Sequence, residues 1–92
     1  MHPGESLRMV LDDAGLSANR AALLMRIPSN RLTAILNGQR GITVETAMRL
    51  GRLFGTPTEM WVNLQTRYEL EVAADALADT VNREVAPLKV AS

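Results

Sequence analysis

The sequence contains no cysteine, and its 92 residues include only one tryptophan, one tyrosine and one phenylalanine. The absence of cysteine excludes disulfide bonds, thiolate metal sites and thiol redox chemistry. Long uncharged runs are missing too, because the longest, residues 32–39, is less than half of the roughly 18 residues that a membrane helix needs. The N-terminus has no basic region followed by an apolar stretch, so we expect no export and a cytoplasmic protein.

The residue sets typical of catalysis are also missing. The single histidine, His2, has no second metal-ligating residue at a spacing typical of metal sites. We expect Met1 and His2 to be frayed. The sequence offers no Ser/His/Asp or Cys/His set, no metal-binding cluster and no glycine loop of the phosphate-binding kind. We therefore expect a protein that is not an enzyme and that needs no cofactor and no metal.

Aliphatic residues and alanine dominate, and no stretch alternates apolar and polar residues for long. This composition favours an all-α fold, and the whole chain, residues 1–92, is long enough for a single domain with one core. Apolar spacing predicts helices at about residues 3–14, 44–54 and 57–84, with a closely joined pair at 17–37. The sequence Thr56-Pro57-Thr58-Glu59 predicts a capping box at the start of the long C-terminal helix.

The helix pair at residues 17–37 is the pattern around which the chain is organised. Ser17 can cap the first helix, Ile27 fills the corner between the two, and Pro28 presets the backbone where the second begins. The second helix buries an apolar face made by Leu32, Ile35 and Leu36, and Asn37-Gly38 ends it. This pattern is typical of a helix-turn-helix, whose second helix enters the major groove of DNA.

The opposite face of that second helix is polar and contains no acid. It carries Ser29, Asn30, Arg31 and Thr33, which are side chains suited to hydrogen bonds with base edges. Arg40 and the helix-terminal N–H groups are then expected to hold phosphates. A plain antiparallel helix pair with a polar outer face is the alternative interpretation.

The formal net charge is zero, but the charges are unevenly distributed. Residues 17–52 contain six arginines and one acid, Glu45, whereas the segments on both sides carry an excess of acids. A cationic segment between acidic ones attracts phosphate locally, and arginine suits bidentate contact to phosphate or guanine. A basic face that is only solvated is the alternative.

Three blocks carry a family resemblance: HPGE at residues 2–5, LNGQRGIT at 36–43 and GTPTEMWVNLQTRYELE at 55–71. Over residues 2–73 the sequence resembles the HigA-type antitoxins, which belong to the lambda-repressor-like helix-turn-helix proteins. The most specific feature is the HPGE start joined to the W-x-N-L-Q-x-x-Y block. The resemblance implies a five-helix domain, a homodimer on an operator, and a cognate toxin that resembles the RelE-type mRNA endonucleases.

Two positions depart from the family pattern. Ala18 stands where family members commonly have a phosphate-binding glutamine, so that role passes to backbone N–H groups and to neighbours such as Asn19 and Arg20. Arg26 stands where the family usually has glycine, and a left-handed backbone there would cost about 1–2 kcal/mol. The residues expected at the DNA are Ser17, Asn19, Arg20, Ser29, Asn30, Arg31, Thr33, Asn37 and Arg40.

Two further surfaces are predicted to bind proteins. A ribosome-dependent nuclease must be basic to bind RNA, so we expect the toxin on the acidic first helix, at Glu5, Asp12 and Asp13. Acids of the last helix, such as Glu71 and Asp75, are the alternative. The apolar stripe of that helix, which includes Ala73, Leu77 and Val81, is expected at the dimer interface, unless it folds back on the core.

The expected function is therefore that of a sequence-specific DNA-binding antitoxin, which represses its own operon and neutralises its toxin. The partners are double-stranded DNA, the toxin and a second copy of the chain. A stand-alone repressor of phage or plasmid type, without a toxin, is the alternative. A toxin-like gene directly adjacent would discriminate the two.

Overall fold

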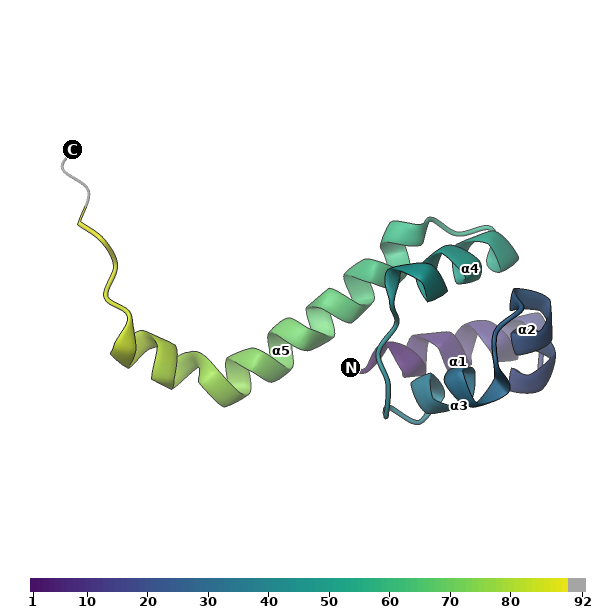
Figure 1. The fold of residues 1–92 in the computed structure, drawn as a ribbon, viewed down its shortest axis with the longest axis horizontal. Helices are drawn as coiled ribbons and strands as arrows, with labels where there is room; N and C mark the ends of the chain where they lie inside the picture. The colour runs from purple at the N-terminus through teal and green to yellow at the C-terminus, as the bar shows by residue number, and fades with distance from the viewer. Residues whose placement is uncertain (90–92) are drawn as a thin grey trace.

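The computed structural model describes residues 1–89, and its secondary structure consists of helices, with no strand in that range (Figure 1). The elements are α1 (Pro3–Ala14), α2 (Ala18–Met25), α3 (Ser29–Leu36), α4 (Val44–Phe54) and α5 (Thr58–Glu84). The first four helices and the start of α5 form a bundle, from which the rest of α5 projects. The predicted five-helix, all-α fold with a long C-terminal helix is confirmed.

The core of the bundle is made by side chains that all five helices contribute. Its largest fully buried members include Leu7 of α1, Leu32 of α3, Leu50 of α4 and Trp61 of α5. The two small alanines of α2, Ala21 and Ala22, are also buried, which allows a neighbouring helix to cross closely. The predicted apolar face of α3 is largely confirmed, because Leu32 and Ile35 are buried and Leu36 is half-buried.

Two glycines mark close backbone contacts that fix the bundle. A Cβ at Gly4 would collide with the carbonyl oxygen of Ile35, so α1 and α3 touch backbone to backbone there. A Cβ at Gly51 would lie 2.7 Å from the carbonyl oxygen of Thr56, where the chain turns from α4 into α5. Neither position has room for a side chain. The contact at Gly4 brings α1 and α3 close together, and the contact at Gly51 brings the start of α5 close to α4.

The predicted capping box at the start of α5 is wrong. The N-cap residue is Pro57, and the Thr56 hydroxyl accepts a hydrogen bond of 2.9 Å from the indole N–H of Trp61 instead. The physical reason is burial, because Trp61 is fully buried and its N–H has to find a partner inside the protein. The first N–H groups of an exposed helix end can bind water at lower cost.

The predicted fraying of Met1 and His2 is also wrong. His2 is the N-cap of α1, and its Nδ1 accepts a hydrogen bond of 2.9 Å from the backbone N–H of Gly4. Its ring packs edge-on against Tyr68 of α5, with the ring centres 4.7 Å apart. The terminal amino group lies 3.2 Å from a carboxylate oxygen of Glu71. The N-terminus therefore joins α1 to the middle of α5.

Beyond this junction α5 leaves the bundle. Every residue from 69 to 79 is exposed, and the apolar side chains Leu70, Leu77 and Val81 are each more than half exposed. The alternative in which the apolar stripe folds back on its own core is therefore wrong. Pro87 prevents further helix, and from the sequence we expect residues 88–92 to be loosely held. Of these, residues 90–92 lie outside the described range. Among residues 1–89, no helix combines the length and the apolar character needed to cross a membrane.

Candidate nucleic-acid interface

The corner between α2 and α3 has helix-turn-helix geometry. Ser17 caps α2, because its hydroxyl oxygen accepts a hydrogen bond of 3.1 Å from the N–H of Arg20. The helix ends at Arg26, whose left-handed backbone has φ 60° and ψ 41°. Ile27 is buried in the corner, and Pro28 is the N-cap of α3. Arg26 therefore has the left-handed backbone for which the family usually has glycine. We expect this conformation to cost about 1–2 kcal/mol for a residue with a side chain.

The N-terminal turn of α3 carries the polar residues predicted to face DNA. Ser29, Asn30 and Thr33 are exposed, whereas Leu32 and Ile35 on the opposite side are buried. The Thr33 hydroxyl donates to the carbonyl oxygen of Ser29 at 3.0 Å, so its oxygen remains able to accept a further hydrogen bond. The helix therefore presents a short polar surface that can meet base edges.

Arg31 is placed differently from its three neighbours. Its side chain is only 25% exposed, and Nη1 donates to Oε1 of Glu45 at 3.0 Å. The same Glu45 oxygen lies 3.7 Å from Nε of Arg49, and Nη1 of Arg49 donates to the carbonyl oxygen of Met25 at 2.9 Å. The guanidinium predicted to read bases is therefore held against α4, and the acid that holds it was not predicted from the sequence.

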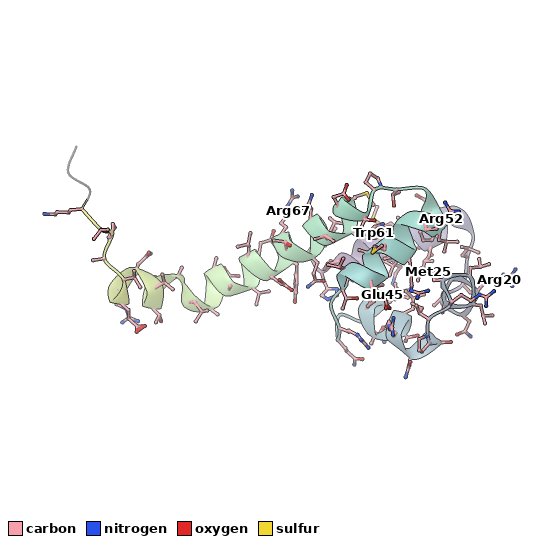
Figure 2. The ribbon with its side chains drawn as sticks, turned by 45° about the horizontal axis from the view of Figure 1, so that its top comes forward. Arg20, Met25, Glu45, Arg52, Trp61 and Arg67 are labelled. Carbon is pink, nitrogen blue, oxygen red and sulfur yellow. The ribbon has the colours of Figure 1, made fainter. Side chains whose placement is uncertain are left out.

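The remaining predicted DNA-binding residues flank α3 on two sides. Asn19 and Arg20 are exposed in the first turn of α2, and Asn37 and Arg40 are exposed in the segment that follows α3. In Figure 2, Arg20 lies at the outer edge of the bundle, on the side away from the projecting part of α5. The structure thus exposes these four side chains on the elements that precede and follow the recognition helix.

Gln65 of α5 positions the segment between α3 and α4, and sequence reasoning missed it. Its side-chain oxygen accepts a hydrogen bond of 2.8 Å from the N–H of Ile42, and its amide nitrogen donates to Glu69 at 3.0 Å. A Cβ at Gly41 would lie 2.8 Å from the Gln65 amide nitrogen, so glycine allows this close contact. Gln65 belongs to the W-x-N-L-Q-x-x-Y block that carries the family resemblance, so the sequence marked the position. Helical periodicity alone does not predict its hydrogen-bond partner, the N–H of Ile42.

A hollow of about 570 Å³ opens between the end of α2 and α4. Its lining combines aliphatic side chains with arginines and one acid: Leu24, Met25, Arg26, Glu45, Met48, Arg49, Arg52 and Leu53. Figure 2 labels three of the lining residues, Met25, Glu45 and Arg52, which lie in the bundle and away from the projecting part of α5. The hollow therefore adjoins the ion pair that holds Arg31.

The acids expected to bind a toxin lie on the outside of α1. Glu5, Asp12 and Asp13 are all exposed, and helical spacing places them opposite the buried Leu7 and Leu11. The structure therefore brings these three carboxylates to one solvent-facing side of a single helix. The residues expected at a dimer interface, Ala73, Leu77 and Val81, are exposed on the projecting part of α5.

Comparison with known proteins decides which family has this geometry. The family model described as "Helix-turn-helix" matches residues 7–61. Among solved structures, an addiction module antidote protein of the HigA family from Coxiella burnetii has 44% sequence identity and a TM-score of 0.90. The aligned region covers 96% of this chain and 97% of that one. The chain belongs to the HigA-type helix-turn-helix family.

Other relatives of this HigA-type chain include transcriptional regulators. The antitoxin HigA of Pseudomonas aeruginosa, solved with the higBA promoter, has 36% identity and a TM-score of 0.94, over 97% of this chain and 98% of that one. Virulence-associated protein I of Dichelobacter nodosus is 45% identical over 79% of this chain and 68% of its own length. The uncharacterized HTH-type transcriptional regulator YbaQ of Escherichia coli is 35% identical over 74% of this chain and 61% of its own length.

Proposed function

We propose that this HigA-type chain is a sequence-specific DNA-binding antitoxin that represses its own operon and neutralises a RelE-like mRNA endonuclease. The observation that carries the DNA-binding part is the exposed polar turn at the start of α3, held by a buried helix-turn-helix corner. Its HigA relative from Pseudomonas aeruginosa was solved with promoter DNA, which supports the same role here. Relatives described as HTH-type transcriptional regulators support a role in the control of transcription.

In this proposal the DNA-binding residues divide into two groups. Ser29, Asn30 and Thr33, together with Arg31, contact base edges in the major groove. Residues before and after α3 contact the phosphates and fix the position of the domain: Ser17, Asn19, Arg20, Asn37 and Arg40. The two groups predict different losses, because base contacts carry sequence information and phosphate contacts do not.

A binding experiment with the chain's own upstream DNA tests this division. Arg31→Ala should weaken operator binding about 5- to 150-fold and relax specificity, since a lost base contact is worth about 1–3 kcal/mol. Arg40→Ala should weaken binding to every sequence and reduce the salt dependence. Arg67→Ala is the charge-matched control, because Arg67 is exposed on α5 and well separated from Arg20 in Figure 2. Parental affinity in both test variants would contradict this docking.

The proposed functional unit is a homodimer joined through the projecting part of α5. One recognition helix covers few base pairs, so two copies would bind half-sites about 34–36 Å apart. Leu70, Leu77 and Val81 lie on one side of α5 at helical spacing and are exposed in the single chain. The dimer residues predicted from the sequence, Ala73, Leu77 and Val81, overlap this stripe. A monomer at high concentration, bound singly to the operator, would contradict the proposal.

The toxin is proposed to bind the exposed acids of α1, which leaves the DNA face accessible during repression. The double variant Asp12→Lys and Asp13→Lys should no longer co-purify with the toxin encoded by an adjacent gene. Its binding to operator DNA should persist. The double variant Glu71→Lys and Asp75→Lys tests the alternative toxin site, since both acids are exposed on α5. Release of the toxin only by the α5 variant would move the site to α5. With no adjacent toxin gene and no co-purifying toxin, a stand-alone repressor would describe the protein better.

A further inference from the structure

Glu45 is the only acid among residues 17–52. Its carboxylate accepts a hydrogen bond from Arg31, the arginine proposed to contact bases. Arg31 lies in the first turn of α3, between the exposed Asn30 and the buried Leu32. Its Nη1 donates to Glu45 at 3.0 Å, and its Nε is buried and has no hydrogen-bond partner within residues 1–89. A bidentate contact to guanine uses two neighbouring N–H groups. Each such pair of the Arg31 guanidinium includes either Nη1, which donates to Glu45, or the buried Nε, so a bidentate base contact competes with the present position of the side chain.

The surroundings of Glu45 allow that release. Arg49 lies on the same helix, with Nε 3.7 Å from the Glu45 oxygen, and is itself fixed by its hydrogen bond to the carbonyl oxygen of Met25. The Glu45 side chain is 62% exposed, so it is hydrated as well as paired. When Arg31 leaves, the carboxylate keeps a neighbouring cation and water. Such a partly exposed ion pair is weak enough to open when better acceptors are offered.

We propose that Glu45 is a specificity-determining residue, which holds Arg31 away from DNA until an operator base offers two acceptors. This inference rests on the proposed function of α3 as the recognition helix. Phosphates of any sequence would attract a freely moving arginine, and this attraction strengthens non-specific binding. With Glu45 as a competitor, a single phosphate contact gives Arg31 little advantage, whereas a bidentate base contact does. Glu45 thus acts through Arg31, as a positioning residue.

The test measures affinity for operator and for unrelated DNA with the full chain. Glu45→Gln removes the charge, and binding to unrelated DNA should strengthen more than binding to operator, so that the ratio of operator affinity to unrelated-DNA affinity falls about 2- to 5-fold. Glu59→Gln is the matched control, because Glu59 is an exposed acid in the first turn of α5. That control should leave the ratio unchanged. Glu45→Asp keeps the charge but shortens the reach, and it should lower the ratio in the same direction.

A double variant separates positioning from simple repulsion of DNA. If Glu45 acts through Arg31, Glu45→Gln should not change the ratio in an Arg31→Ala background. An equal change in both backgrounds, or an unchanged ratio in the single variants, would overturn the proposal. Melting curves of each variant check that the bundle remains folded.

A measurement without DNA distinguishes failure of this proposal from failure of the proposed function. NMR of the arginine side chains should show hindered rotation of the Arg31 guanidinium in the parent and faster rotation in Glu45→Gln. Fast rotation in the parent would overturn the restraint itself, whatever the protein binds. A second outcome is hindered rotation of Arg31 in a parent protein that binds operator and unrelated DNA equally well. That result would confirm the ion pair but overturn both its role in specificity and the proposed function.

Discussion

The bundle and the projecting part of α5 are both helical, yet they are helical for different reasons. In the bundle each helix is short and buries one face, as α3 does with Leu32 and Ile35. Along residues 69–79 of α5 every residue is exposed, so packing within this chain contributes little to that stretch beyond the contact of Glu71 with the terminal amino group. Isolated helical segments of this length are marginal in water. The comparison teaches that the bundle is stabilised by its own core, whereas the projecting helix has no comparable core within the single chain.

Leucine-to-alanine substitutions in the two regions should have different consequences, one for the stability of the bundle and the other for assembly. Leu32→Ala removes a fully buried side chain and should lower the free energy of unfolding by about 2–5 kcal/mol, because it leaves a cavity. Chemical denaturation followed by circular dichroism measures this change. Leu77→Ala is the control on exposed α5 and should alter the midpoint only in a concentration-dependent way. Equal losses that do not depend on concentration would show that α5 is stabilised within the single chain.

A charge placed in the exposed stripe should break assembly without unfolding the bundle. Leu77→Asp should weaken self-association at least 100-fold, which corresponds to about 2.7 kcal/mol. The reason is that a buried, unpaired carboxylate would be left in the interface. Sedimentation equilibrium measures the association constant, and the signal from Trp61 reports the bundle. Asp79→Asn, also exposed on α5, is the control. Unchanged association of Leu77→Asp would place the interface elsewhere.

The junction between the two regions depends on Gln65, and its removal should have an intermediate effect. Gln65→Ala leaves the N–H of Ile42 without its protein partner and should cost about 1–2 kcal/mol, since the group is partly buried. Thermal unfolding and amide hydrogen exchange at Ile42 measure the effect. Asn63→Ala, at an exposed position on the same helix, should change little. Unaltered exchange at Ile42 in the Gln65 variant would contradict this role.

The smallest effect is expected at the left-handed turn between α2 and α3. Arg26→Gly should stabilise the bundle by less than about 1 kcal/mol, because relief of the left-handed strain is partly offset by the conformational entropy of glycine. Gly15→Ala is the reverse experiment at the end of α1, where φ is 67° and the space around the Cβ is open. It should destabilise by about 1 kcal/mol. Differential scanning calorimetry resolves both shifts, and shifts of the same sign would refute the argument.

Local features of the sequence were sufficient to predict most helices. The bounds of α1 follow from Pro3 and Gly15, and the recognition helix follows from Pro28 and the spacing of Leu32 and Ile35. These features act within one or two turns of chain, so neighbouring residues determine them. The errors at His2 and Thr56 arose where a local rule competed with a partner distant in sequence or buried in the core.

The sequence by itself determined the helical periodicity, the left-handed helix ends and the polar face of α3. Only the tertiary structure decided which side chains meet: Arg31 with Glu45 across 14 positions, and Gln65 with Ile42 across 23. It also decided that the apolar stripe of α5 stays exposed. The physical reason is that periodicity defines the face of each helix, whereas contacts between helices depend on crossing geometry. Close packing at positions such as Gly4 and Gly51 sets that geometry, and a linear pattern does not contain it.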